Sequence, residues 1–418
     1  MKTISAPFAF GLALLLSTLP AQAETRLTAL YAWPAHQKFH QPIAQAFSVL
    51  HPDITIDFRA PAQNYDEALQ MLTRQQVAGQ LPDVAFAGFN MLRELAARRI
   101  IKPIDDLAAL DDLGRLGYAA NILDLGKVEG RQFGIPFATS TPIVYVNADL
   151  VRQAGGDPEN LPKNWDDFIA LGGKISRLGG DMSGMYYELG SDDWTTQNLI
   201  NNFGGRMMDP LETQVAFDSP EGLAALTTFN RFHAEGGQPR VEQRAARQLF
   251  TAGRLGFYFA SPSGVSGFEK DVGDRFKMTT ATMPLGSQQA TMPTGGMALV
   301  ILNDDPAIRK AAWDYIRFAT GPQSQMMVVK ATGYMPSNEL AMAADLLGNF
   351  YEVHPNWRTT ATQRERARPW FAWPGSNGVR ISQVLRDNME AISLGTKKPQ
   401  QALKDMARSV QSMLARTN

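Results

Sequence analysis

The sequence contains no cysteine. This absence excludes disulfide bonds, a thiol nucleophile, a zinc site built on cysteine, and a lipid attached to an N-terminal cysteine. An excess of one charge is also absent, because 40 basic residues face 41 acidic ones and the formal net charge is −1. Nucleic acids and anionic lipids require a basic face, so we expect neither as a partner.

Long hydrophobic runs are absent after the first two dozen residues. Residues 1–23 have the pattern of a signal peptide, with Lys2 at the start, an apolar run over 8–19, and the small residues Ala21 and Ala23 at the cleavage position. The run is too short for a permanent membrane anchor. We therefore expect an exported protein without a lipid anchor, in the periplasm of a double-membraned bacterium, with release to the medium as the alternative.

Motifs of catalysis and of metal binding are missing too. The sequence has no HExxH, no P-loop and no G-x-S-x-G, and its five histidines are scattered. His36 and His40 are four residues apart, but no third ligand is evident, so we expect no metal and no cofactor. Asp192 and Asp193 could serve as the carboxylates of a glycosidase, although adjacent residues rarely face each other across a sugar. A periplasmic glycoside-acting enzyme remains the alternative function, and a purely structural exported protein is a third.

Alternating strands and helices dominate the first part of the chain. The patterns predict strands at 26–31, 54–58 and 84–86, separated by helices at 42–50, 64–80 and 90–98. This order is typical of a parallel sheet covered on both faces. Ligands of such sheets bind beyond the carboxyl ends of the strands.

The rest of the chain predicts a second lobe and a hinge. Strands at 133–137 and 143–146 flank a short polar segment, as expected for a segment that crosses between lobes, and Asn164 is the predicted N-cap of a helix over 165–177. Gly295 and Gly296 precede a predicted strand at 297–302, and further helices are expected at 307–320, 381–395 and 399–415. The length exceeds what one hydrophobic core usually supports. We predict an α/β fold of two doubly wound lobes, with lobe I from 24–139 plus 297–335 and lobe II from 140–296 plus 336–418.

The order of several short motifs resembles one family. These motifs are Tyr31-Ala32-Trp33, Leu81-Pro82-Asp83-Val84, Gly134-Ile135-Pro136-Phe137, Pro162-Lys163-Asn164-Trp165, Pro293-Thr294-Gly295-Gly296 and Thr332-Gly333-Tyr334-Met335-Pro336. Together they resemble the extracellular solute-binding proteins of ABC importers for sugars and glycerol derivatives. Within that family, Tyr31-Ala32-Trp33-Pro34-Ala35-His36 and Phe350-Tyr351-Glu352 are most similar to binders of glycerol phosphate and sulfoquinovosyl glycerol.

The resemblance implies a hinged two-lobed fold of the type II periplasmic binding protein class. It also implies a small sugar-like ligand, a permease partner in the inner membrane, and a monomeric receptor. The head group of the ligand is left open as neutral, phosphate or sulfonate.

Candidate ligand contacts follow from topology and from the resemblance. Stacking on an aromatic ring, with hydrogen bonds to each hydroxyl, is the usual way to bind a polyol or glycoside. Topology favours Trp33 and His36 after the first strand, and Trp194 with Gly190 before a helix of the second lobe; local core packing and helix capping are the alternatives. The full set of expected contacts is Trp33, His36, Tyr65, Asn90, Ser140, Thr141, Gly190, Trp194, Gly296, Tyr334 and Arg380.

Some of these positions carry open alternatives. Asn90 could instead cap a helix, and the hydroxyls of Ser140 and Thr141 could instead satisfy the backbone of the hinge. Arg380 occupies the place where similar proteins use an arginine for an anionic group, and its alternative is a solvent-exposed arginine. The cluster Trp370, Phe371 and Trp373 could line the cleft or wrap the junction of the lobes.

Overall fold

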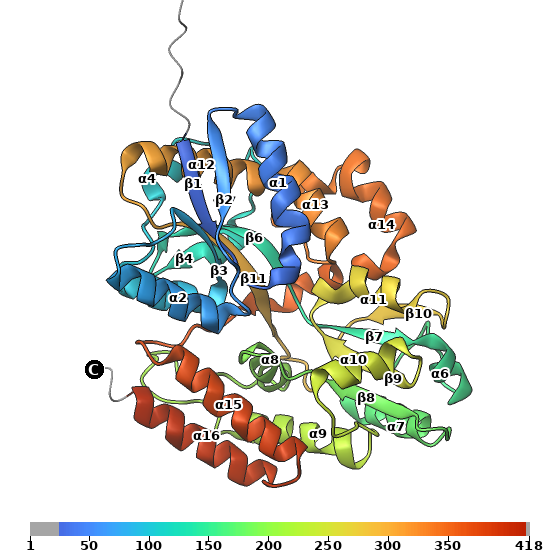
Figure 1. Ribbon diagram of the computed structural model, residues 1–418. Coiled ribbons are helices and arrows are strands. Elements are labelled where there is room, and N and C mark those ends of the chain that lie inside the picture. Colours follow the sequence, from blue (N-terminus) through green and yellow to red (C-terminus); the bar gives the residue numbers. More distant parts are fainter. Residues whose placement is uncertain (1–24, 415–418) are drawn as a thin grey trace, which may run out of the picture.

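Two separate β-sheets, each with helices packed on it, organise the chain in the computed structural model, which describes residues 25–414. Figure 1 shows the first sheet in the upper part of the molecule and the second in the lower part, joined by segments that run between them. The predicted signal peptide lies outside the described residues. No helix within 25–414 is long and apolar enough to cross a membrane.

The first sheet has the strand order β12-β11-β3-β1-β2, and β6 pairs with β11. Strand β1 runs parallel to β2 and β3, whereas β11 runs antiparallel to β3 and β6. The parallel arrangement predicted for the first three strands is therefore confirmed. The strands of this sheet are β1 (Thr25–Leu30), β2 (Ile54–Phe58), β3 (Val84–Gly88), β6 (Gly134–Ser140), β11 (Met292–Ile301) and β12 (Ala367–Pro369).

The second sheet has the order β10-β7-β9-β8. Strand β7 is antiparallel to β9 and β10, and β8 is parallel to β9. The strands are β7 (Ile143–Asn147), β8 (Ser183–Tyr187), β9 (Leu255–Ala260) and β10 (Met278–Ala281). A small hairpin, β4 (Lys127–Val128) and β5 (Arg131–Gln132), completes the strands of the described residues.

Helices cover these sheets on both sides (Figure 1). Those that precede β8 in the chain are α1 (Gln37–Leu50), α2 (Tyr65–Val77), α3 (Leu92–Ala97), α4 (Asp105–Ala108), α5 (Ala120–Leu123), α6 (Ala148–Gln153) and α7 (Trp165–Ser176). Those that follow it are α8 (Trp194–Asn202), α9 (Pro220–Ala234), α10 (Gln243–Thr251), α11 (Val265–Val272), α12 (Pro306–Ala319), α13 (Pro322–Ala331), α14 (Asn349–Val353), α15 (Gly378–Ser393) and α16 (Pro399–Leu414).

The hydrophobic residues form three buried clusters. One surrounds the first sheet, and the other two lie on opposite faces of the second sheet. Strand β7 shows why, because Val144 and Val146 belong to one cluster while Ile143 and Tyr145 belong to the other. Successive side chains of a strand point to opposite faces. A continuous apolar run in this strand is therefore buried on both sides.

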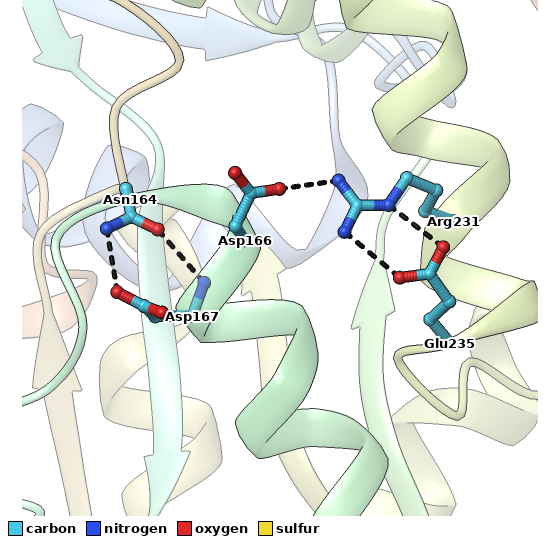
Figure 2. Close-up of polar contacts among 5 residues, drawn as sticks. All are labelled: Asn164, Asp166, Asp167, Arg231 and Glu235. Carbon is cyan, nitrogen blue, oxygen red and sulfur yellow. Dashed lines mark hydrogen bonds and ion pairs between the residues drawn. The ribbon is translucent and has the colours of Figure 1, made fainter.

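Helix α7 begins as the sequence predicts. The side chain of Asn164 accepts a hydrogen bond from the backbone N–H of Asp167 at 2.9 Å and donates one to its carboxylate, also at 2.9 Å (Figure 2). The predicted N-cap is confirmed. Arg231 of α9 pairs with both Asp166 and Glu235, and this joins α7 to α9 at the surface (Figure 2).

Two predicted boundaries are wrong. The first helix begins at Gln37, so Pro42 lies inside α1 instead of at its start. Proline within the first turns of a helix removes only one hydrogen bond, which the buried face of α1 compensates. Strand β11 begins at Met292, so Gly295 and Gly296 lie inside the strand and not before it. At Gly296 the backbone of β6 leaves no room for a Cβ, whereas at Gly295 the atoms nearest to a Cβ would belong to the side chains of Trp194 and Ser140.

The lobe boundaries stay a prediction. Lobe I denotes the first sheet with its helices, and lobe II denotes the second sheet with its helices. The short segment between β6 and β7 passes from one sheet to the other, and Thr141 within it exchanges hydrogen bonds with Thr360. Just before this segment, the backbone of Thr139 in β6 pairs with the backbone of Met335.

His40 of α1 is a fully buried histidine whose replacement tests the packing of lobe I. Its ring lies 4.1 Å from that of Phe86 and stacks on Phe137, and neither ring nitrogen has a hydrogen-bond partner within residues 25–414. Burial, with a smaller effect of His36, lowers the pKa of His40 well below its ordinary value. We expect His40→Leu to raise the free energy of unfolding by about 1 kcal/mol, because a buried N–H without a partner is removed.

The gain from His40→Leu is expected to grow as the pH falls. The unfolded wild-type chain takes up a proton near its ordinary pKa of about 6.5, whereas the folded chain keeps His40 neutral. Wild-type stability is therefore lost below that pH by up to about 1.4 kcal/mol for each pH unit from this residue alone. Urea unfolding at neutral and at mildly acidic pH measures the difference. His354→Leu, at an exposed histidine, is the control. If the stability gain of His40→Leu does not change with pH, His40 is not kept neutral by burial.

Candidate ligand-binding site

A cavity of about 530 Å³ lies between the two lobes. It gathers the ends of strands from both sheets: Trp33 follows β1, Ser140 ends β6, Gly190 follows β8 and Ser261 follows β9. Carboxyl ends of strands are the usual place for ligands in open α/β sheets. The predicted contacts that line this cavity are Trp33, His36, Tyr65, Ser140, Gly190, Trp194, Gly296 and Tyr334.

Four aromatic rings form one wall of the cavity. The ring centroids of Trp33 and Tyr65 are 5.9 Å apart, those of Tyr65 and Trp370 are 6.2 Å apart, and those of Trp370 and Trp194 are 6.5 Å apart. Lobe I supplies Trp33 and Tyr65, and α8 of lobe II supplies Trp194. Such a wall suits the apolar face of a sugar or another ligand with C–H groups.

Trp33 reaches the cavity through an unusual backbone conformation. Its φ of 69° lies in the left-handed region, which large residues rarely adopt. The neighbouring Ala32 pairs with Ala62, and the N–H of Trp33 donates to the carbonyl of Ala62 at 2.8 Å. These contacts hold the turn after β1 in place. Backbone strain of this kind is concentrated at functional sites.

A buried carboxylate holds two tryptophans, Trp370 and Trp373. Asp193 accepts hydrogen bonds from the indole N–H of Trp370 at 3.0 Å, from that of Trp373 at 2.7 Å, and from the amide of Gln197 at 3.0 Å. Burial raises the pKa of Asp193, and these donors act in the opposite direction. The carboxylate therefore fixes the position of Trp370, one of the four rings of the wall.

Trp194 is fixed independently of Asp193. Its indole N–H donates to the carbonyl of Pro293 at 2.8 Å, which ties α8 to the start of β11. The ring lies against Gly295, where a Cβ would come within 2.8 Å of the indole. The absence of a side chain at Gly295 therefore allows the ring of Trp194 to lie beside the cavity.

Two further carboxylates lie near the aromatic wall. Asp192 lines the cavity and accepts a hydrogen bond from the N–H of Trp194 at 3.0 Å. Burial raises the pKa of Asp192 to about 7, and burial followed by the charge of Asp193 raises the pKa of Asp66 to about 6. A carboxyl group accepts a hydrogen bond from a ligand hydroxyl when it is ionised and can donate one when it is protonated.

Neutral polar groups occupy the neighbouring part of the cavity. Burial, with a smaller effect of Lys38, lowers the pKa of His36 to about 3, and burial raises the pKa of Tyr334 to about 12. Their rings meet edge to face at 6.1 Å, and Nδ1 of His36 has no partner within the described chain. Uncharged donors and acceptors of this kind suit ligand hydroxyls.

Three predicted contacts lie outside the cavity lining. Asn90 lies just behind it, in the short helix Phe89–Met91, with its Oδ1 buried near Gly88. The alternative that Asn90 caps a helix is wrong, because the cap positions there are Gly88 and Met91. Thr141 lies in the hinge and bonds Thr360, and Arg380 lies exposed on α15. Their ligand roles stay predictions.

Several residues of the lining are not predicted from the sequence. Trp370 belongs to the aromatic cluster for which the sequence leaves two positions open, the cleft and the junction of the lobes. Lys38, Glu188 and Arg247 also line the cavity, and no motif marks them. Lys38 is the second residue of α1 and lies two residues after His36. Its closeness in sequence to the predicted contact His36 is the signal that could have found it. Nothing in the sequence brings Arg247 of α10 to the same place.

Other features of the described residues do not compete with this site. No group of three or more His, Cys, Asp or Glu residues within 25–414 could hold a metal ion. A second cavity of about 680 Å³ lies within lobe II, between the loop at 158–163 and β10. It lacks the aromatic wall and does not lie between the sheets.

Two sheets joined by crossing segments, with a polar and aromatic cavity between them, define a two-lobed solute-binding protein. Residues 42–352 match the family of bacterial extracellular solute-binding proteins. The chain belongs to this family.

Individual relatives cover nearly the whole chain. A putative binding protein of Brucella abortus is 25% identical over 412 residues, which is 97% of each chain. The sn-glycerol-3-phosphate-binding periplasmic protein UgpB of Escherichia coli is 23% identical and covers 86% of each chain. The crystal structure of UgpB from Mycobacterium tuberculosis in complex with glycerophosphocholine superposes with a TM-score of 0.82 at 24% identity, covering 92% of this chain and 98% of the other. The sugar-binding protein MalE of Xanthomonas citri gives 0.78 at 22% identity, covering 94% of this chain and 98% of the other.

Proposed function

We propose that the protein is the periplasmic substrate-binding component of an ABC importer for a sugar, a glycoside or a glycerol derivative. The observation that carries this proposal is the cavity between the lobes, with an aromatic wall from both lobes and neutral polar groups beside it. The similarity to UgpB and to MalE supports the same ligand class. The chain acts as a monomer that delivers its ligand to the membrane permease, with no nucleic-acid partner.

Ligand binding and lobe closure are coupled in this proposal. Contacts from lobe I and lobe II reach one ligand together only when the lobes are close, so the ligand shifts the population toward the closed form. The permease then recognises that form. Each buried hydroxyl needs a hydrogen-bond partner, and this requirement gives specificity.

Calorimetric titration tests the proposal. The panel contains maltose, tagatose, sn-glycerol 3-phosphate, glycerophosphocholine and sulfoquinovosyl glycerol. We expect at least one to bind with micromolar or tighter affinity, about −8 kcal/mol or better. Trp194→Ala should abolish most of that affinity. Flat titrations throughout the panel would count against this ligand class.

A glycoside-acting enzyme has weaker support from the geometry. Of the two adjacent carboxylates, Asp192 lines the cavity, whereas Asp193 bonds Trp370, Trp373 and Gln197 behind it. A glycosidase needs two carboxyl groups on opposite sides of one glycosidic bond. The relatives are binding proteins, and we propose that this chain has no catalytic activity of its own.

An ion pair between the lobes gives a separate prediction for closure. Arg93 of α3 in lobe I pairs with Glu212 in lobe II. Because both side chains are partly exposed, the pair contributes about 0.2–1 kcal/mol to the closed form. Arg93→Gln should therefore weaken ligand binding by up to about fivefold through faster dissociation, measured by stopped-flow fluorescence. Arg152→Gln, which breaks a pair within lobe II, is the control and should leave the rate unchanged.

A further inference from the structure

Two cations from opposite lobes line one part of the same cavity. Lys38 belongs to the first turn of α1 in lobe I, and Arg247 belongs to α10 in lobe II. In Figure 1 the lower end of α1 points toward α11, and α10 lies below α11. Positively charged groups that face one another across a hinge repel each other unless an anion lies between them.

Lys38 has no acidic partner in the described part of the chain. Within residues 25–414, no carboxylate oxygen lies within ion-pair distance of its amine. Partial burial at the cavity, followed by the charge of Arg247, lowers the pKa of Lys38. The ammonium is therefore less stable here than in water, and a negative group on a ligand would reverse that effect.

Two contacts hold the guanidinium of Arg247 in place, one with Asp271 and one with Phe268. One Nη donates to Asp271 at 3.1 Å, and the planar group lies over the ring of Phe268 at 4.1 Å. These contacts leave its other N–H groups available. A planar guanidinium with free N–H groups is well suited to phosphate and sulfonate oxygens.

The acids that line the cavity, Glu188 and Asp192, have hydrogen-bond donors of their own. Glu188 lines the cavity and accepts a hydrogen bond from the hydroxyl of Tyr258 at 2.6 Å. Burial raises the pKa of Glu188, while the bond from Tyr258 and the charge of Arg247 lower it. Glu188 therefore has its own donors and does not replace an anion between the lobes. Nδ1 of His36, nine-tenths buried and without a partner in the described chain, points to a further ligand contact in the same cavity.

We propose that Lys38 and Arg247 form an anion subsite that binds the phosphate or sulfonate group of the ligand and makes lobe closure depend on that group. This inference rests on the proposed function and deepens it, because it assigns an anionic ligand to the receptor. The residues differ from the sequence prediction, which left the head group open and named Arg380 and His36 as the residues that would favour an anion. Arg380 lies exposed on α15 and does not line the cavity.

Inorganic sulfate tests the subsite without knowledge of the natural ligand. Sodium sulfate is compared with sodium chloride at equal ionic strength, and the melting temperature and the distance between spin labels on the two lobes are recorded. We expect sulfate, but not chloride, to raise the melting temperature and to shorten the distance in the wild type. Lys38→Gln and Arg247→Gln should each lose both responses. Arg244→Gln, on the same helix but outside the cavity lining, should keep them.

Paired ligands extend the test to a natural head group. sn-Glycerol 3-phosphate should bind about tenfold or more weakly to each single variant, because a hydrogen bond to a charged group is lost. Neutral ligands that contain glycerol should bind the single variants with nearly the wild-type affinity. Equal responses to sulfate and chloride in the wild type, or equal sulfate responses in all variants, overturn the subsite.

The same experiment separates failure of the subsite from failure of the receptor function. If neutral sugars bind and close the wild type while sulfate has no effect, the receptor function stands and the anion subsite is wrong. If sulfate acts through Lys38 and Arg247 while no solute of the calorimetric panel binds, the subsite stands and the proposed ligand class is wrong.

Discussion

Replacement of Asp193 by alanine is expected to lower the free energy of unfolding by about 3 kcal/mol and to weaken ligand binding at least tenfold. The carboxylate is 1% exposed and accepts hydrogen bonds from Trp370, Trp373 and Gln197. Alanine leaves the two buried indole N–H groups without an acceptor, whereas the amide of Gln197 keeps its hydrogen bond to the carbonyl of Phe371 at 3.0 Å. A buried donor without a partner costs about 1–3 kcal/mol, and relaxation or water entry recovers part of that sum.

The loss of affinity should follow from the position of Trp370. This ring lies 6.2 Å from Tyr65 and 6.5 Å from Trp194, so its release disrupts the aromatic wall in the middle. Urea unfolding and calorimetry measure the two effects. Asp193→Asn should be intermediate, because its amide oxygen can still accept one indole N–H. Glu390→Ala on the exposed face of α15 is the control, and a stable Asp193→Ala with normal affinity contradicts the assignment.

Replacement of Gly296 by alanine is expected to have the largest effect on folding. Its φ is 123°, where only glycine is unstrained, and a Cβ would lie 1.9 Å from the carbonyl oxygen of Ala138 in β6. Both β6 and β11 would have to separate at the hinge. We expect a loss of about 3 kcal/mol or more, with a protein that unfolds at much lower urea concentration or fails to accumulate.

The neighbouring Gly295 provides the matched comparison. A Cβ there would lie 2.8 Å from the ring of Trp194 and 3.0 Å from the hydroxyl of Ser140, both of which are side-chain atoms. Gly295→Ala should therefore fold, with Trp194 displaced and affinity reduced by tenfold or more. The contrary result would be a Gly295→Ala variant with wild-type affinity, or a Gly296→Ala variant with wild-type stability.

Local patterns predicted the parts of the fold that depend on periodicity. The order of β1, β2 and β3 with their helices and the cap at Asn164 follow from short-range rules of burial and capping. The boundaries at Pro42 and at Gly295 failed because tertiary packing extends α1 and β11 past residues that usually interrupt helices or strands.

The candidate site was predictable where topology places it and unpredictable where distant segments meet. Trp33 and Trp194 follow or precede regular elements at the sheet edge, so a rule about strand ends finds them. Lys38 and Arg247 are far apart in the sequence and belong to different lobes, and only the tertiary arrangement of the two lobes brings them to one cavity. Arg380, the position suggested by similar proteins, lies exposed on α15, and its ligand role stays a prediction.

A distance measurement between the lobes tests the central claim most directly. Because the sequence has no cysteine, Gln70→Cys in α2 and Gln383→Cys in α15 provide unique sites for spin labels. We predict that a solute bound in calorimetry shortens the distance between the labels and narrows its distribution, and that Trp194→Ala abolishes this change. A solute that binds tightly while the distribution stays the same would contradict a receptor that closes on its ligand.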